Sequence, residues 1–269
     1  MLRQRCITAA ILAPLFLAII GFLPSSFVAI VLGLIVLIGA WELSQLVRLT
    51  QKPQQTLYIV LFSLAMAIGY TVITAAVLQP IQLIATISWI GLTVWALLRR
   101  RLLPTIAGRR PGMLIIGSLI LYIAWITLIN IHQTAGPVWL IGLFILIWAV
   151  DIGAYFAGRQ WGKRRISPHI SPGKTWAGAL GATAAAILYA IGFGVWQSIP
   201  LFNLILLSCL VTWLSIGGDL AESVLKRQAG VKDSGTLLPG HGGILDRIDS
   251  LLAAAPAYAV GISLLGLTA

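Results

Sequence analysis

The stretch that decides the fold is Val138-Trp-Leu-Ile-Gly-Leu-Phe-Ile-Leu-Ile-Trp-Ala-Val-Asp-Ile-Gly-Ala-Tyr-Phe156, in which Asp151 is the one charged residue. A helix of about 20 mostly apolar residues crosses the hydrocarbon core of a bilayer, which is about 30 Å thick. The strands of membrane barrels alternate apolar and polar residues instead, and this stretch does not alternate. It therefore predicts a membrane-spanning α-helix with a carboxyl group near one end.

Eight further stretches have the same apolar character. The nine predicted spanning helices cover Cys6 to Leu23, Phe27 to Leu46, Leu57 to Leu78, Ile81 to Leu98, Gly112 to Asn130, Val138 to Phe156, Trp176 to Trp196, Leu201 to Ser223 and Ser250 to Leu267. The composition agrees, since 59% of residues are hydrophobic, 9% are charged and the mean hydropathy is +0.99. A water-soluble protein carries about 25% charged residues. The sequence thus predicts an all-α, polytopic integral membrane protein.

The charged residues predict the orientation of these helices. There are 18 Lys and Arg residues and 7 Asp and Glu residues, which gives a formal net charge of +11. All 18 basic residues fall in alternate connections: the N-terminus and the second, fourth, sixth and eighth loops. Basic residues concentrate in the cytoplasmic loops of membrane proteins. We therefore expect a cytoplasmic N-terminus and an external C-terminus, and the net charge needs no nucleic-acid partner.

The acidic residues divide the chain into two parts. Glu42 is the only acid in residues 1–135, and the other six lie between Asp151 and Asp249. We interpret residues 1–135, with helices one to five, as a transmembrane scaffold, and residues 136–269, with helices six to nine, as the catalytic region. The predicted cytoplasmic loops of the catalytic region are 157–175 and 224–249.

Four aspartates are expected near the cytoplasmic ends of the C-terminal helices: Asp151, Asp219, Asp246 and Asp249. A carboxylate at the centre of a spanning helix costs about 2.5–3.5 kcal/mol, so such residues usually mark functional sites. Carboxylates suit Mg²⁺, which binds one or two of them together with substrate phosphates. We predict Asp219, Asp246 and Asp249 as metal ligands. The alternative is that these acids only pair with arginines of the loops.

The segment from Ser223 to Asp249 adds cations and glycines to these acids. It contains Lys226, Arg227, Lys232, Gly240, His241, Gly242 and Gly243. Lysine and arginine bind phosphate oxygens, and glycines let backbone N–H groups approach a ligand closely. The combination predicts a phosphate-binding site.

Two neighbouring cations at the end of helix eight are expected to differ. Glu222 and Lys226 are four residues apart and would form an ion pair on the helix surface. Arg227 would point about 100° away, free to bind a phosphate through two parallel hydrogen bonds.

This segment resembles the signature of the phosphatidate cytidylyltransferase family, also called CDP-diacylglycerol synthases. The family pattern S-x-apolar-K-R-x4-K-D-x-small-x2-apolar-x2-H-G-G-apolar-x-D-R-apolar-D is matched without exception from Ser223 to Asp249. Further similar residues are Trp41, Glu42, Asp151-Ile-Gly-Ala-Tyr155, Gly158-Arg159, Gly162-Lys163 and Ile170-Ser-Pro-Gly-Lys-Thr175. One departure is Ala177, where many relatives carry Glu or Gln.

The resemblance implies the reaction of CTP with phosphatidate to give CDP-diacylglycerol and diphosphate, a step of phospholipid biosynthesis. It implies Mg²⁺ as the cofactor, with a second cation left open, and a site facing the cytoplasm at a bacterial inner membrane. Catalytic roles are implied for Asp219, Lys226, Arg227, Asp246 and Asp249. Substrate phosphates are expected at Asp151, Lys174, Ser223, Lys232, His241, Gly242, Gly243 and Arg247.

Small residues on predicted helix seven leave the oligomeric state open. Ala177, Gly181 and Ala185 follow one another at four-residue spacing, a pattern that lets helices pack closely. The stripe could pack within the chain or form a homodimer.

Two other functions use similar residues. A CTP-dependent lipid kinase of the dolichol or phytol kinase type would transfer the γ-phosphate of CTP instead. An ion-coupled transporter also uses acids within the membrane, but transporters typically show interrupted segments in two corresponding halves. The acids of this chain are confined to one half, and the full-length signature favours the cytidylyltransferase.

Overall fold

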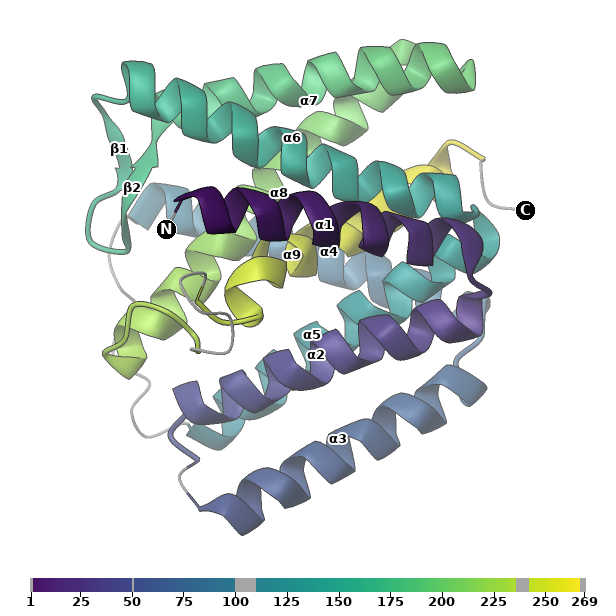
Figure 1. The fold of residues 1–269 in the computed structure, drawn as a ribbon, viewed down its shortest axis with the longest axis vertical. Coiled ribbons are helices and arrows are strands. Elements are labelled where there is room, and N and C mark those ends of the chain that lie inside the picture. The colour runs from purple at the N-terminus through teal and green to yellow at the C-terminus, as the bar shows by residue number, and fades with distance from the viewer. Residues whose placement is uncertain (1, 50, 100–109, 236–241, 267–269) are drawn as a thin grey trace.

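The computed structural model describes residues 2–49, 51–99, 110–235 and 242–266. These residues form nine helices and one β-hairpin (Figure 1). The helices are α1 (Leu2–Phe22), α2 (Ser25–Leu46), α3 (Lys52–Val72), α4 (Ala75–Arg99), α5 (Arg110–Thr134), α6 (Pro137–Trp161), α7 (Trp176–Gln197), α8 (Leu201–Ala229) and α9 (Leu245–Leu264). The predicted helical membrane fold is confirmed.

Seven of the helices in the described part of the chain, α2 to α8, are long and apolar enough to cross a membrane. The two remaining helices stand at opposite ends of the chain, and α9 begins with the charged residues Asp246, Arg247 and Asp249. The helices run side by side, so that α1 begins at one end of the bundle and α9 ends at the other (Figure 1). This arrangement fits an odd number of crossings, while the assignment of either end to the cytoplasm stays a prediction.

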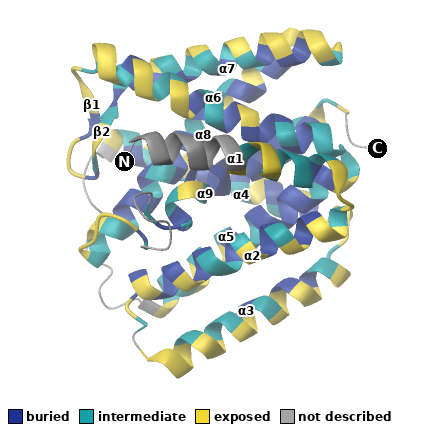
Figure 2. Cartoon of the chain, viewed as in Figure 1, coloured by how far each residue is buried: buried dark blue, intermediate teal, exposed yellow. Residues whose placement is uncertain are grey.

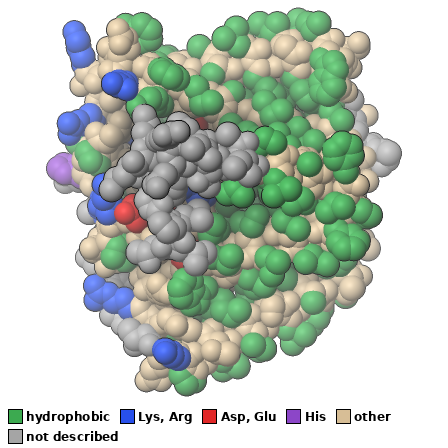
Figure 3. Space-filling model, in the orientation of Figure 1, with side chains coloured by type: hydrophobic (Ala, Val, Ile, Leu, Met, Phe, Trp, Pro, Cys, Tyr) green, Lys and Arg blue, Asp and Glu red, His purple; other side chains and the backbone are tan. Residues whose placement is uncertain are grey.

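Charged and apolar side chains separate along the bundle. On the face drawn in Figure 3, Lys and Arg side chains gather at the end that carries the hairpin in Figure 1. Hydrophobic side chains cover the middle and the opposite end. A belt of this kind faces lipid, and the basic end matches the alternation of charge in the loops.

The helix α9 lies at the centre of the bundle, where it contacts α8, α4 and α5. Ala253, Ala254 and Ala255 on this helix are completely buried. Their small side chains let the surrounding helices approach closely. Exposed residues lie on the outward faces of helices at the edge of the bundle, among them α3 and α7 (Figure 2). The two halves of the chain therefore share one core, because α4 and α5 of the first half pack against α9 of the second.

The small residues of α7 pack within the chain. A β-carbon added to Gly153 on α6 would lie 2.7 Å from the carbonyl oxygen of Gly181 and 2.7 Å from the β-carbon of Ala185. The backbones of α6 and α7 are thus in direct contact. The stripe at Gly181 and Ala185 is used inside the molecule and gives no support to a homodimer.

A β-hairpin follows α6, within the segment that the sequence predicted as the loop 157–175. The α6 helix continues to Trp161, and β1 (Arg165–Ser167) then pairs antiparallel with β2 (Ser171–Thr175). Ile166 and Ile170 are completely buried or nearly so, and they anchor the hairpin to the bundle. Its turn contains Pro168, a residue that favours turns because its φ angle is fixed. Strands were not predicted here.

The hairpin leads directly into α7. The N–H group of Gly178 donates a 3.1 Å hydrogen bond to Oγ1 of Thr175, which caps the helix. Such a cap contributes about 1 kcal/mol to stability. It fixes Lys174, the neighbouring residue of β2, at the edge of the bundle next to α8.

Candidate active site

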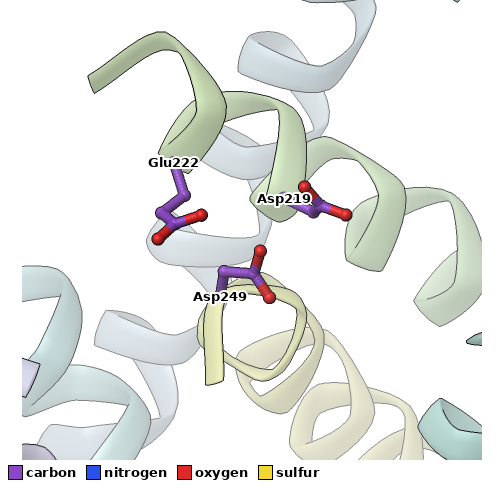
Figure 4. A group of neighbouring side chains, drawn as sticks. All are labelled: Asp219, Glu222 and Asp249. Atoms are coloured by element: carbon purple, nitrogen blue, oxygen red, sulfur yellow. The ribbon is translucent and has the colours of Figure 1, made fainter. Parts of the chain in front are cut away.

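Three carboxylates meet where α8 contacts α9. Asp219 and Glu222 lie on α8 and face Asp249 on α9 (Figure 4). One oxygen from each residue lies within 4.8 Å of the others. Glu222 and Asp249 are buried, and Asp219 is half-buried. Carboxylates this close repel one another when ionised, so this acid cluster requires cations or protons.

One lysine approaches the acid cluster from the hairpin. Nζ of Lys174 lies 2.6 Å from Oδ2 of Asp219 and donates a 3.3 Å hydrogen bond to the carbonyl oxygen of Ile216. Ser223, on the next turn of α8, places its hydroxyl 3.4 Å from Oδ1 of Asp219. The predicted substrate residues Lys174 and Ser223 therefore both contact Asp219.

A second lysine lies between two acids. Lys226 forms an ion pair with Glu222, as its spacing predicted, and its Nζ is also 2.5 Å from Oδ1 of Asp246. The side chains of Lys226 and Glu222 are only 12% and 5% exposed. The predicted pairing is confirmed, but its expected position on the helix surface is wrong, because α9 covers it.

Asp246 is held by donors from the protein itself. Its Oδ2 accepts hydrogen bonds from the N–H groups of Gly243, at 2.8 Å, and Ser234, at 2.9 Å, and from the Ser234 hydroxyl at 3.0 Å. Burial favours the neutral acid, but Lys226 and these two N–H groups outweigh it and lower the pKa of Asp246 to about 2. Asp246 is thus an ionised anchor for the segment that precedes α9.

Glu222 has the opposite character. Neither of its carboxyl oxygens has a hydrogen bond within the described part of the chain, and the residue is 4% exposed. The contact with Lys226 has the distance of an ion pair but not the direction of a hydrogen bond. A buried oxygen without a donor is costly unless another positive group faces it. The three carboxylates that converge are Asp219, Glu222 and Asp249. The sequence predicted Asp246, rather than Glu222, as the third metal ligand.

The remaining basic residues of the predicted site lie at the molecular surface. Arg227, Lys232 and Arg247 are exposed. Nε of Arg227 donates a 3.3 Å hydrogen bond to the carbonyl oxygen of Ile170 in the hairpin turn. This contact links the end of α8 to the hairpin and leaves the guanidinium partly accessible.

The glycines of the predicted phosphate loop are explained in part. Gly242 has a φ angle of +80°, and a β-carbon on it would lie 2.8 Å from Oδ2 of Asp246. Both observations require glycine. His241 lies outside the described residues.

Two cavities border the acid cluster. The first, of about 250 Å³, is named the polar cavity because its wall, which also contains apolar residues, carries the charged and polar side chains of Asp151, Lys174, Thr175, Asp219 and Ser250. Asp151 and Asp219 were expected to lie at the same depth, and they do share this cavity. It opens between the hairpin and helices α6 to α9.

The second cavity, of about 320 Å³, is almost wholly apolar. Its wall includes Trp89 and Trp95 of α4 and Met113 of α5, and Glu222 and Asp249 are the acids that line it. The acid cluster thus separates a polar cavity from an apolar one, with Asp219 on the first and Glu222 and Asp249 on the second.

Besides Glu222, a second residue near the site was not expected from the sequence. Glu42, on α2, is completely buried and accepts hydrogen bonds from the N–H groups of Ile244, at 2.9 Å, and Leu245, at 2.7 Å. A member of the predicted scaffold half therefore holds the start of α9. The Trp41–Glu42 pair was noticed as a point of resemblance, but no sequence pattern connects it to a contact 203 residues away.

The sequence of the chain also matches a known protein family. A family model described as "Cytidylyltransferase family" matches residues 3–265. The chain belongs to this family. The match runs from α1 to the end of α9, so the cytidylyltransferase family accounts for the whole bundle as well as for the signature segment. Membership makes the protein a nucleotidyltransferase, in agreement with the sequence prediction.

Three curated relatives share nearly the full length of this cytidylyltransferase. The phosphatidate cytidylyltransferase of Pseudomonas aeruginosa is 40% identical over 96% of both chains. The phosphatidate cytidylyltransferase of Haemophilus influenzae is 35% identical over 96% of this chain and 97% of its own. That of Bacillus subtilis is 30% identical over 95% of each chain.

Proposed function

We propose that the protein converts CTP and phosphatidate to CDP-diacylglycerol and diphosphate. Relatives of this name match it over almost the whole chain. The observation that carries the proposal is the position of the acid cluster between a polar and an apolar cavity. A reaction between a nucleotide and a lipid needs such a boundary, because one substrate is a soluble polyanion and the other carries acyl chains.

The chemistry asks for positioning rather than for a strong base. An oxygen of the phosphatidate phosphate attacks the α-phosphorus of CTP and forms a new P–O bond. The bond between the α-phosphorus and the bridging oxygen breaks, and diphosphate leaves with the electron pair. Since the nucleophile is already an anion, the protein must hold two polyanions in line and neutralise their charge.

The residues of the polar cavity suit the nucleotide. Lys174 is fixed by the hairpin and Asp219, where it can also reach a phosphate oxygen. We assign Arg227, Lys232 and Arg247, which are exposed near the same end of the bundle, to the phosphates of the two substrates. The apolar cavity provides room for part of an acyl chain beside Glu222 and Asp249.

The acid cluster suits Mg²⁺. Hard carboxylate oxygens are the ligands that this ion prefers, and among the described residues the buried Glu222 oxygens have an ion-pair partner in Lys226 but no hydrogen-bond donor. Asp219, Glu222 and Asp249 carry three negative charges when ionised, and the lysines in contact with them are Lys174 and Lys226, the second of which also pairs with Asp246. The acid cluster therefore has room for a further positive charge. Asp219, Glu222 and Asp249 would hold Mg²⁺, which when bound would neutralise the charge of substrate phosphates.

We also propose that the protein lies in a bacterial cytoplasmic membrane with its site facing the cytoplasm. The relatives are bacterial, and Asp219 of the acid cluster contacts Lys174 of the hairpin, which lies at the basic end of the bundle. CTP is available on that side.

The deciding experiment uses purified protein in detergent with phosphatidate, Mg²⁺ and CTP labelled at the α- or γ-phosphate. We expect the α-label, and not the γ-label, to appear in a lipid product identified as CDP-diacylglycerol. Transfer of the γ-label would instead identify a lipid kinase. Absence of any lipid product from a folded, Mg²⁺-supplied protein would contradict both.

A further inference from the structure

The carboxylate of Glu42 joins the first half of the chain to the signature segment. It accepts hydrogen bonds from the N–H groups of Ile244 and Leu245, and its Oε2 lies 3.1 Å from the hydroxyl of Ser234, which shares its one proton between Glu42 and Asp246. The residue is completely buried. A buried charged group is retained only where several donors meet it, so this carboxylate is a fixed point of the fold.

Glu42 acts as a helix cap supplied by another helix. The first N–H groups of a helix have no partner within it, and Ile244, at the cap position of α9, provides no side-chain cap. Glu42 fills this role for Ile244 and Leu245, and its negative charge is favourable at the positive end of the helix dipole. The N–H group of Gly243, just before the helix, donates to Asp246. Two carboxylates, those of Glu42 and Asp246, therefore bind the N–H groups at the start of α9.

The hydroxyl of Ser234 lies between these two carboxylates. Its oxygen is 3.1 Å from Oε2 of Glu42 and 3.0 Å from Oδ2 of Asp246. The N–H group of Asp246 also approaches this hydroxyl at 3.3 Å. Displacement of Glu42 would therefore shift Ser234 and with it Asp246, which in turn contacts Lys226.

Two glycines of the signature segment are explained by the same carboxylate. A β-carbon added to Gly235 would lie 2.4 Å from Oε1 of Glu42, and its three nearest neighbours are all atoms of that side chain. A β-carbon on Gly243 would lie 2.2 Å from Oγ of Ser234 and 2.5 Å from Oε2 of Glu42. The segment lies so tightly on Glu42 that only glycine fits at these positions.

We infer that Glu42 is a positioning residue of the active site. It fixes the start of α9, and thereby the places of Asp246 and Asp249 relative to α8. The contacts of Glu42 can be tested without an assay of the reaction, whereas its expected effect on turnover rests on the proposed function.

The test is a double-mutant cycle of Glu42→Asp and Gly235→Ala, measured by thermal unfolding without metal and by steady-state kinetics per folded protein. Shortening Glu42 withdraws the carboxylate and makes room for the new methyl group. We expect each single variant to lower kcat about 10–100-fold, the usual range for residues that orient a metal site. When Gly235→Ala is added to Glu42→Asp, kcat should fall by less than about a further threefold, because the methyl group and the carboxylate no longer collide. The KM for CTP should change little.

Gly91→Ala is the matched control, because a β-carbon there meets nothing within 4 Å. Its kcat should equal that of the wild type, and its Tm should be equal or slightly higher, because alanine favours a helix more than glycine does. Equal effects of Gly235→Ala on Tm in both backgrounds would overturn the inferred contact. A Tm coupling with unchanged kcat per folded Glu42→Asp protein would reduce Glu42 to a structural role and overturn the positioning one.

These outcomes are separate from the proposed reaction. If the wild type makes no CDP-diacylglycerol, the proposed function fails, while the Tm coupling still decides whether Glu42 holds the segment. If Glu42→Asp does not fold, Glu42→Gln replaces it, because it keeps the length of the side chain but exchanges one acceptor oxygen for an NH2 group: reduced kcat with unchanged KM for CTP would support the inference, and wild-type kcat would overturn it.

Discussion

Gly218 of α8 touches the backbone of Asp249 in α9: a β-carbon on this glycine would lie 2.5 Å from the Asp249 carbonyl oxygen. The two helices can approach this closely only because the glycine has no side chain. Asp219, the next residue of α8, is thereby brought to Asp249. The spacing of the acid cluster is thus set by a backbone contact.

Gly218→Ala should push α8 and α9 apart. A shift of about 1 Å in a catalytic site can cost about 100-fold in rate, so we expect a loss of this size in kcat. Steady-state kinetics of the folded variant measures it, with Gly91→Ala as the control. Wild-type turnover in Gly218→Ala would show that the cluster tolerates other spacings.

Asp249→Asn and Asp246→Asn should fail in different ways. Asp249 faces the other carboxylates, so its amide variant should raise the Mg²⁺ concentration for half-maximal activity by about tenfold or more. Asp246 holds Lys226 and two N–H groups, so its variant should lose about 1–3 kcal/mol of stability. Mg²⁺ titrations and thermal unfolding separate the two effects. A reversed pattern would return Asp246 to the set of metal ligands predicted from sequence.

Lys226→Arg should lower both stability and activity, although it keeps the positive charge. The lysine is enclosed by Glu222 and Asp246, and a larger group in such a space typically costs about 1–3 kcal/mol. Both Tm and kcat should fall. Lys163→Arg, at an exposed position, is the control, and a Lys226→Arg variant as stable as this control would argue against the enclosed geometry.

Arg227→Lys should affect binding more than stability. Its guanidinium is exposed apart from the bond to Ile170, and lysine cannot offer two parallel donors to a phosphate. We expect a higher KM for CTP or phosphatidate, with Tm within about 2 °C of the wild type. Unchanged KM for both substrates would remove Arg227 from the phosphate site.

The membrane orientation can be tested with single cysteines. In a background without Cys6 and Cys209, His169→Cys in the hairpin turn and Gln133→Cys at the far end of α5 are both exposed. An impermeant thiol reagent should label them from opposite sides, with His169→Cys reached from the cytoplasm. Labelling from one side only would contradict the predicted topology.

The sequence predicts the helices well but not where they end. Hydropathy places the end of α6 at Phe156 and that of α8 at Ser223, whereas the helices reach Trp161 and Ala229. Apolar residues are required only within the bilayer, and a helix can continue into water on its backbone hydrogen bonds alone. The hairpin escapes prediction because β1, with three residues, is too short to show alternation.

The site could be predicted as a group of acids but not as a geometry. Asp219 and Asp249 are found because the first lies near the end of one predicted spanning helix and the second near the start of the next, on the same predicted side of the membrane. Glu222 is missed as a member because the lysine four residues later offers it a partner. Asp246 shares a helix face with Asp249, and only the contacts with Ser234 and Gly243 show that its oxygens are occupied.

The central position of α9 has a consequence for biogenesis. Because this helix follows the other eight in the chain, the ribosome releases it after they have emerged. Until it inserts, the faces of α4, α5 and α8 that it later covers must meet lipid, and Asp219 and Glu222 lack their third carboxylate. The nascent protein therefore acquires its acid cluster in one late event, and a chain truncated before α9 would be inserted yet inert.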